Sequence, residues 1–275
     1  VVGILIATIL GFVMGVARLS KNWLIAKIAT VYVETLRNIP LLLQIFFWYF
    51  AVLQPLPGPR NSMVMGESFF LNNRGIYVPE PIAGDGFNVV WIALLIGIIG
   101  AIGLSRWASK RQEATGQQFP SFMAGLGLII GLPLLAFVAM GAPLTFEMPT
   151  QTRFNLKGGV QIIPEFIALL LALSTYTAAF IAEIVRAGIL AVPHGQTEAA
   201  ESLGVKKSVT LRLIIIPQAM RVVIPPLTSQ YLNLAKNSSL ATAIGYPDIV
   251  SVFMGTTLNQ TGQAVEIVAM TMAVY

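Results

Sequence analysis

The chain has 275 residues, of which 56% are hydrophobic and only 11% are charged, and its mean hydropathy is +0.77. Because soluble domains carry about 25% charged residues, this composition excludes an ordinary soluble domain and a disordered chain. The lack of cysteine excludes disulfides and thiolate chemistry, and the single histidine, His194, excludes a histidine-rich metal site. We expect a membrane protein that holds no metal and binds no nucleic acid, its net charge of +5 reflecting loop orientation.

Seven apolar segments are candidate membrane spans, since about 20 mainly apolar residues cross the hydrocarbon core. In chain order they are Val1–Ala17, Asn38–Leu53, Phe87–Ser105, Ser121–Gly141, Ile162–Arg186, Met220–Ala235 and Gly262–Tyr275. Pro225 and Pro226 are expected to break the sixth span. The sequence starts without Met and stops inside an apolar run, so we expect both ends to be truncated.

The loops predict an orientation. Most of the 17 basic residues lie in the loops after the first, third and fifth spans, which places these loops in the cytoplasm. Residues 54–86 and 142–161 then lie outside. The first of these segments is rich in Pro, Gly and Asn and is expected to be an irregular extracytoplasmic loop.

Glycines recur at helical spacing within the spans: Gly11 and Gly15, Gly127 and Gly131, and Gly97, Gly100 and Gly103. Small residues at this spacing let helix backbones approach closely in lipid, so we interpret them as packing residues. A role in lining a pore or a ligand site is the alternative.

The loop between the fifth and sixth spans is amphipathic and predicts two short helices. Pro193 suits a first helical turn, Gly204 suits a stop or a bend, and a second helical stretch runs from Val205 to Ile216. Composition alone leaves two interpretations open, a peripheral membrane segment and a helix that docks a partner. His194 adjoins this elbow and is interpreted as a docking-surface residue, since it has no evident acidic neighbour for catalysis.

The same loop matches the spaced pattern E-A-A-x3-G-x9-I-x-L-P, with Ile216 in place of Leu. The matching residues are Glu198, Ala199, Ala200, Gly204, Ile214 and Pro217. This pattern resembles the ATPase-coupling loop of permease subunits of bacterial ATP-binding cassette importers. Residues 34–44 (ETLRNIPLLLQ) and the stretch from Pro225 to Leu240 resemble the polar amino acid branch, and within it the general L-amino acid permeases of Gram-negative bacteria.

The resemblance implies an all-α polytopic protein of the bacterial inner membrane with the type I importer permease fold. It covers about residues 1–55 and 160–275. We therefore expect N-terminal spans and an interfacial helix in 1–55, and an insertion with an extracytoplasmic loop and two extra spans in 56–160. Core spans with the coupling loop, about 191–217, would fill 161–275.

Such a permease forms half of a translocation pathway for L-amino acids. The resemblance implies as partners a second permease, homologous or identical, two ATPase subunits, a periplasmic amino acid-binding protein, the L-amino acid and membrane lipid. The chain has no phosphate-binding loop of the G-x-x-x-x-G-K-[ST] type, so we expect no cofactor and no enzymatic activity of its own. ATP and Mg²⁺ would be bound by the partner ATPase.

Polar residues within spans are costly and are functional candidates. The candidate substrate path comprises Gln44, Tyr176, Thr177, Glu183, Asn233, Lys236, Asn237, Ser238 and Ser239. Each has a structural alternative: an amide bridge between helices, hydroxyl bonds across helices, a Glu183–Arg186 ion pair, or capping of the loop after the diproline. A Glu34–Arg37 pair is expected to organise an interfacial helix, Trp48, Tyr49 and Trp91 to anchor the outer interface, and Asp248 to cap a turn or helix.

Two rival functions remain at this stage. An ion-coupled secondary amino acid transporter would need no docking elbow and would usually show internal repeats. A membrane-embedded enzyme would need a convergent cluster of acid, base or metal ligands, and none stands out in the sequence.

Overall fold

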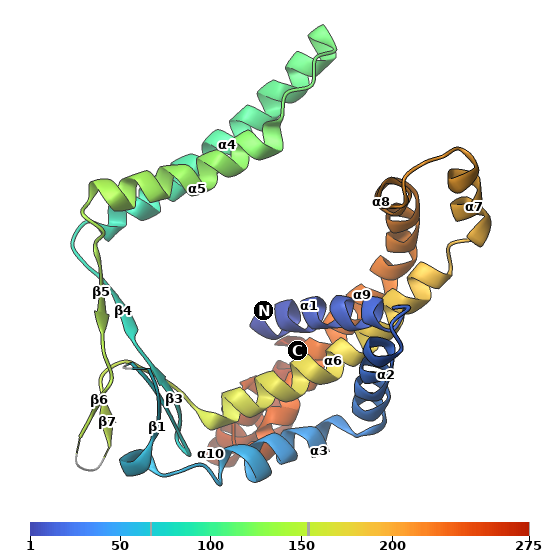
Figure 1. The fold of residues 1–275 in the computed structure, drawn as a ribbon. Coiled ribbons are helices and arrows are strands. Elements are labelled where there is room, and N and C mark those ends of the chain that lie inside the picture. The colour runs from blue at the N-terminus through green and yellow to red at the C-terminus, as the bar shows by residue number, and fades with distance from the viewer. Residues whose placement is uncertain (67, 153–154, 275) are drawn as a thin grey trace. The chain divides into compact units, whose positions relative to one another are not determined.

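The computed structural model describes residues 1–66, 68–152 and 155–274, and most of them are helical (Figure 1). The N-terminal helical elements are α1 (Val2–Ala17), α2 (Trp23–Asn38), α3 (Leu41–Phe46), η1 (Phe47–Leu53) and η2 (Pro59–Asn61). They are followed by α4 (Phe87–Thr115), α5 (Ser121–Ala139), α6 (Pro164–Leu190), α7 (His194–Ser202), α8 (Lys207–Thr210), η3 (Leu211–Ile215) and α9 (Ile216–Asn237). The last elements are η4 (Ser238–Ile244), η5 (Ser251–Thr257), α10 (Leu258–Thr261) and α11 (Ala264–Val274).

The predicted spans coincide with apolar helices. In the described chain, α4, α5, α6 and the continuous helical segment 207–244 are long and apolar enough to cross a membrane. Helix α2 and the α3–η1 segment form a further pair bent by 106°, and α1 and α11 are shorter apolar helices. The bend falls at Pro40, which cannot donate a backbone hydrogen bond. These helices confirm the expected all-α polytopic class, although α4 continues past the predicted Ser105 to Thr115.

The predicted break at Pro225 and Pro226 is wrong, because α9 runs through both prolines to Asn237. Both proline rings lie on an exposed face, whereas Val223 and Leu227 on the other face are buried. The helix can therefore accommodate the rings and the lost hydrogen bonds on a side that is exposed in the described structure. The helix type changes only after Asn237, where the tighter turns of η4 begin.

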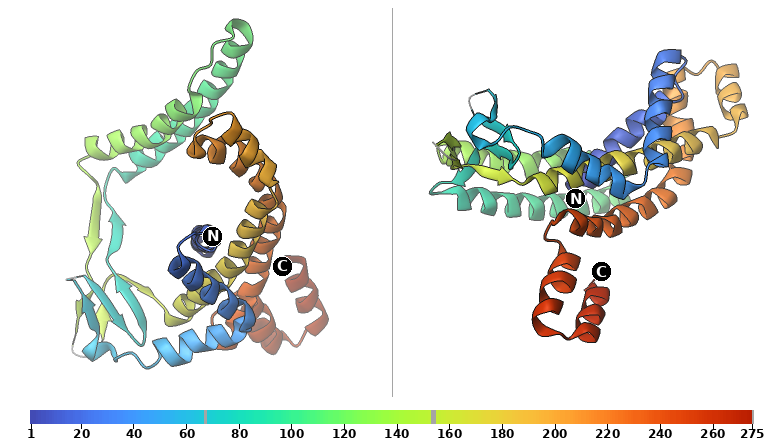
Figure 2. Two further views of the ribbon diagram at one scale, coloured as in Figure 1. Left: turned by 45° about the vertical axis from the view of Figure 1, so that its right-hand side comes forward. Right: turned by 90° about the horizontal axis from the view of Figure 1, so that it is seen from below.

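The described residues form two compact units. The first comprises 1–63, 71–76 and 162–275, and the second comprises 64–70 and 77–161. The expected three-part organisation remains a prediction. Within the first unit, α6 is the central helix: it packs against α1, α2, α3 and α9, and 13 of its 27 residues are buried. Two views show α1 and α9 alongside α6 (Figures 1 and 2).

Helices α1 and α6 are in very close contact. A Cβ atom at Gly11 would lie 2.6 Å from Cβ of Ile181, and one at Gly15 would lie 2.7 Å from the carbonyl oxygen of Ala182. Both distances are shorter than real Cβ contacts, so only glycine permits this approach. Gly97 similarly meets the Leu128 carbonyl oxygen at 2.7 Å, between α4 and α5. By contrast, Gly103, Gly127 and Gly131 face open space, so the packing interpretation holds for only some of the glycines.

We expect Gly11→Val to loosen the α1–α6 contact and to destabilise the protein by about 1–3 kcal/mol, as overpacking usually does. Gly127→Val is the matched control, because it adds the same side chain to a helix position with nothing within 4 Å. Thermal unfolding of the purified protein in detergent measures the difference. Equal midpoints for the two variants would contradict the packing role of Gly11.

The second unit contains a long apolar hairpin, α4 and α5, which lie side by side in both views (Figures 1 and 2). Short strands lie in the segments directly before and after this hairpin: β1 (Met63–Met65), β2 (Phe69–Asn72), β3 (Gly75–Val78), β4 (Glu80–Ala83), β5 (Leu144–Glu147), β6 (Thr150–Gln151), β7 (Leu156–Lys157) and β8 (Val160–Ile162). The strand order is β1-β2-β3-β8 in one sheet, and β4-β5 and β6-β7 are antiparallel pairs.

The strands correct the expectation that 54–86 is irregular. Strands β2 and β3 are joined at Asn73–Arg74, and the fully buried Asn72 shapes this turn. Its Oδ1 accepts the Arg74 backbone N–H at 2.8 Å and its Nδ2 donates to Ser62 Oγ at 3.0 Å. Phe70 and Tyr77 are buried beside Leu156, so aromatic residues of the strands supply a small core of their own.

Candidate functional site: the elbow, an ion cluster and an apolar pocket

The predicted elbow is present as α7, a tight reversal at Gly204, and the continuous helix that starts with α8. The Gly204 N–H donates to the Glu201 carbonyl at 2.9 Å, and the Val205 N–H donates to the Ala200 carbonyl at 3.0 Å. This pair of hydrogen bonds is the Schellman arrangement, which requires a left-handed residue directly after the helix. Gly204 fills that position with φ +69°. The position is open, because a Cβ there would meet nothing within 4 Å.

The other residues of the spaced pattern lie on both arms of the elbow. Ala200 is 3% exposed and is the residue through which α7 packs on the rest of the described chain. Ala199 and Glu198 are exposed. Ile214 lies half-buried in η3, and Pro217 is the second residue of α9, where its missing N–H costs little. The arrangement presents one face of a short rigid helix to its surroundings.

His194 has an acidic neighbour after all, which corrects the sequence interpretation. Its Nδ1 lies 2.9 Å from Glu198 Oε1, one helical turn away, and both side chains are largely exposed. An exposed pair of this kind contributes little to stability, about 0.3–0.5 kcal/mol. In the structure, this contact directs the first carboxylate of the pattern towards the first residue of α7.

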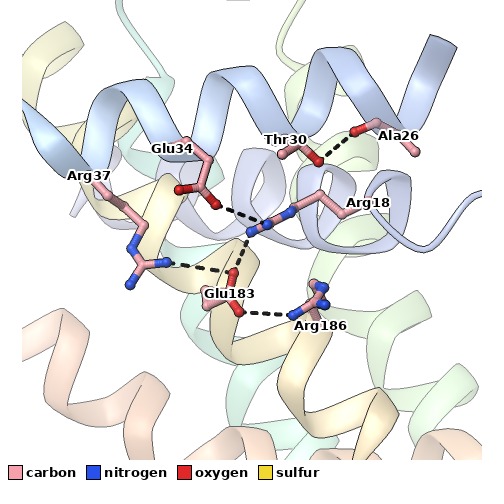
Figure 3. A network of polar contacts seen from close by, with 7 residues as sticks. All are labelled: Arg18, Ala26, Thr30, Glu34, Arg37, Glu183 and Arg186. Carbon is pink, nitrogen blue, oxygen red and sulfur yellow. Dashed lines mark hydrogen bonds and ion pairs between the residues drawn. The ribbon is translucent and has the colours of Figure 1, made fainter. Parts of the chain in front are cut away.

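Glu183 is the centre of an ion cluster near the end of α6 that leads to α7 (Figure 3). One carboxylate oxygen, Oε1, accepts from Arg186 Nη1 at 3.1 Å, and Oε2 accepts from Arg18 and lies 3.6 Å from Arg37 Nη1. Arg18 also donates to Glu34 Oε1 at 3.2 Å. Three helices, α1, α2 and α6, are thus joined through one carboxylate.

The cluster confirms the Glu183–Arg186 pair and changes the other predicted pair. The sequence pairs Glu34 with Arg37, but in the structure Glu34 binds Arg18, while Arg37 binds Glu183 and lies 5.4 Å from the Phe180 ring centroid. The spacing of charges in the sequence does not indicate the part that Arg18 takes in this cluster. The available signal was its position, because it directly follows the apolar run of α1.

Gln44 lies beside a cavity of about 430 Å³. Its side chain is 5% exposed, and its Nε2 donates to the carbonyls of Leu36 and Ile39, each at 2.9 Å. These bonds bridge the bend between α2 and α3. Its Oε1 is buried and has no partner in the described structure. The cavity is lined by Tyr32, Leu36, Ile39, Leu43, Gln44, Phe47, Trp48 and Thr175.

Among the hydroxyl-bearing residues of α6, some are buried and others are half-buried. Thr177 is buried at 3% exposure, while Tyr176 is half-buried and packs on the Phe180 ring at 4.9 Å between centroids. Thr175 lines the cavity, and its carbonyl accepts from the Tyr32 hydroxyl at 2.8 Å.

The predicted cluster after the diproline spans the end of α9 and the start of η4. Asn233 and Lys236 are exposed, and Asn237, Ser238 and Ser239 are half-buried. The two serine hydroxyls donate to the carbonyls of Ala235 and Lys236, at 2.7 and 2.9 Å. The capping alternative therefore describes both serines. Because α9 is unbroken before Asn237, the cluster is placed by a helix end and not by a kink at the prolines.

Two further predictions can be compared with the structure. Asp248 caps a helix, as expected: its Oδ1 accepts from the Ser251 N–H at 2.8 Å and from the Thr242 hydroxyl at 2.9 Å. Of the aromatic residues, Trp91 is 58% exposed and suits an interface, but Tyr49 donates to Glu165 Oε1 at 2.8 Å and Trp48 lines the cavity.

Several apolar helices long enough to cross a membrane place the chain in the class of multi-pass membrane proteins. The chain belongs to the family described as binding-protein-dependent transport system inner membrane component, whose model matches residues 7–275. It is therefore a multi-pass permease component of the inner membrane, as the sequence predicts.

Two relatives are closely similar in sequence. The chain is 59% identical to the putative amino-acid ABC transporter permease protein YhdX of Escherichia coli K12, over 99% of this chain and 69% of the relative. It is 58% identical to the general L-amino acid transport system permease protein AapQ of Rhizobium johnstonii, over 100% of this chain and 68% of the relative.

A solved structure has a similar fold. The crystal structure of an amino acid ABC transporter with histidines matches with a TM-score of 0.54 at 20% identity, covering 100% of this chain and 79% of the other. At this identity the match supports the permease fold, and the chemistry of the site has to be argued from this chain.

Proposed function

We propose that the chain forms half of the translocation pathway of an ATP-driven, binding-protein-dependent importer of L-amino acids. The observation that carries the proposal is the elbow, in which a spaced E-A-A-x3-G pattern ends in a left-handed Gly204 on the family's fold. Relatives that are nearly 60% identical are named as amino acid permeases, which supports the substrate class.

The proposal requires partner subunits. A second permease, homologous or identical, completes the pathway, two ATPase subunits bind ATP and Mg²⁺ and receive α7, and a periplasmic binding protein delivers the amino acid. The chain itself supplies no ATPase site. Its residues Glu198, Ala199, Ala200, Gly204, Ile214 and Pro217 form the arm that transmits the motion of the ATPase.

The function is tested by uptake in proteoliposomes that contain this chain with its partner subunits. We expect uptake of labelled L-amino acids to require both ATP inside and binding protein outside. Uptake driven by a proton or sodium gradient without ATP would favour an ion-coupled secondary transporter and would contradict the proposal.

We further propose that the substrate passes Gln44, Tyr176 and Thr177 on one side and the cluster from Asn233 to Ser239 on the other, towards Glu183. The buried, unpartnered Oε1 of Gln44 supports the first part, because an ammonium group is a donor that such an acceptor lacks. In the second part, the exposed Lys236 supplies a positive charge for the carboxylate.

Lys236→Met should reduce transport of every amino acid together, because all substrates share the carboxylate. The loss of a hydrogen bond to a charged group, about 1.5–3 kcal/mol, corresponds to a roughly 10- to 150-fold weaker transmembrane site. The measurement is transport at saturating binding protein across a substrate series. Lys27→Met is the control, since it removes an equivalent charge from the exposed α2. Wild-type rates for Lys236→Met with every substrate would make Lys236 structural.

A further inference from the structure

The α4–α5 hairpin contains a groove that shares no residue with the elbow, the ion cluster or the cavity at Gln44. The groove has a volume of about 530 Å³ and lies between the middle of α4 and the N-terminal half of α5. Ile98 and Ile102 of α4 and Leu126 and Ile129 of α5 form apolar walls. The two helices approach each other closely at the floor of the groove, where a Cβ at Gly125 would lie 3.4 Å from Cβ of Ala101.

One end of this apolar groove is polar and basic. Arg106, Ser105 and Ser121 line that end, and the Arg106 side chain is exposed. Lys110 and Arg111 follow on the next turn of α4, against the single carboxylate of Glu113. An anion at the mouth of the groove would therefore meet a net positive field together with hydroxyl donors.

The surroundings of the basic end are those of a membrane interface. Trp107 packs edge-to-face on Phe119, with 5.6 Å between ring centroids, and the Arg111 guanidinium lies 5.3 Å from the Trp107 ring centroid. Aromatic and basic side chains gather where hydrocarbon gives way to headgroups. Only 6% of the most apolar window of each helix is buried within the described structure, which leaves most of the surface of both helices available for contact with lipid.

We propose that this groove binds an anionic phospholipid, with an acyl chain between α4 and α5 and the headgroup phosphate at Arg106. The apolar walls match the chain, and the net positive charge at one end matches an anionic headgroup better than a zwitterionic one. The basic end belongs to a loop whose charge predicts a cytoplasmic location, where anionic lipid heads attract Lys and Arg. A helix of a partner subunit would need an acidic side chain opposite Arg106.

The test is native mass spectrometry of the intact transporter complex in mild detergent, titrated with phosphatidylglycerol or with phosphatidylethanolamine of the same acyl chains. We expect phosphatidylglycerol to bind better, and Arg106→Gln to weaken it about fivefold or more, the effect of roughly 1 kcal/mol per basic residue at an anionic surface. Lys157→Gln is the control, because Lys157 is an exposed basic residue of strand β7 that belongs neither to the α4–α5 hairpin nor to the groove lining. Equal binding of the two lipids, or unchanged binding by Arg106→Gln, would overturn the proposal.

Two further measurements distinguish the other occupants. Inorganic phosphate at millimolar concentration should fail to displace the lipid, and displacement would mean that the site recognises phosphate alone. The chain has no cysteine, so Phe122→Cys places a single thiol beside the groove. This thiol should react with a maleimide-bearing phosphatidylglycerol analogue. Cross-linking instead to a partner subunit would assign the groove to protein and contradict the proposal.

Discussion

Glu183→Gln should strongly destabilise the packing of α1, α2 and α6 in the first unit. The substitution keeps the size of the side chain but removes the charge that Arg18, Arg37 and Arg186 share. The Arg18 side chain is only 10% exposed, so its guanidinium would lose most of its compensation with little access to water. Removal of one partner from a buried pair costs 3–5 kcal/mol, and we expect about 2–3 kcal/mol because Glu183 itself is 30% exposed.

Glu34→Gln is the matched control, since it also removes a carboxylate bound to Arg18. The Glu34 side chain is 55% exposed, so we expect a loss of no more than about 1 kcal/mol. Thermal unfolding of the purified complex at low and moderate salt compares the two variants. If Glu183→Gln unfolds no earlier than Glu34→Gln, the cluster does not hold α1, α2 and α6 together.

Gly204→Val should destabilise the turn that joins α7 to α8 and leave the fold of the spans intact. Valine is branched at Cβ, and the left-handed conformation at φ +69° costs such a residue about 1–3 kcal/mol. Because nothing lies within 4 Å of a Cβ there, the effect comes from the backbone and not from a clash. The Schellman hydrogen bonds of Gly204 and Val205 should open, which exposes 191–206 to protease.

If α7 docks the ATPase as proposed, Gly204→Val should also lower substrate-stimulated ATP hydrolysis and uptake by about tenfold, with binding-protein affinity unchanged. Gly204→Asn separates the two explanations, because asparagine tolerates the left-handed region and should retain most of the coupling. Loss of stimulation in both variants would point to a need for glycine at the docking surface. Wild-type stimulation in Gly204→Val would contradict the coupling role of the elbow.

The sequence predicts the parts of this protein that depend on local rules. Lipid imposes length and apolarity on each span, so the helices can be located from composition, and the elbow can be located because Gly204 is specified by neighbouring backbone geometry. The contacts of Arg18 could not be predicted in this way, because they depend on how α1, α2 and α6 are brought together. Spacing alone suggested Glu34 with Arg37, and tertiary packing selected other partners.

Two other failures have similar causes. A diproline usually interrupts a helix, but whether it does depends on which face the rings occupy, and that is decided by the packing of Val223 and Leu227. The strands of residues 63–83 are too short and too rich in turn residues to give a periodic signal, and they form because strands distant in sequence pair, as Ile82 does with Thr145. The sequence identifies Gln44 as a polar residue in a span. Its unpartnered oxygen and the cavity beside it can be identified only in the folded structure.

The length of helix α6 determines how it can transmit motion. Its 27 residues make a rod of about 40 Å that runs unbroken from Glu165, held by Tyr49, to Leu190, just before α7 begins at His194. The glycine-mediated contact with α1 and the charges on Glu183 stiffen this rod near the end that leads to α7. A tilt of about 10° imposed there would therefore sweep the opposite end through about 7 Å, roughly the width of a small metabolite. The helix would therefore move as one rigid rod, because the ion cluster around Glu183 keeps the end that leads to α7 from bending.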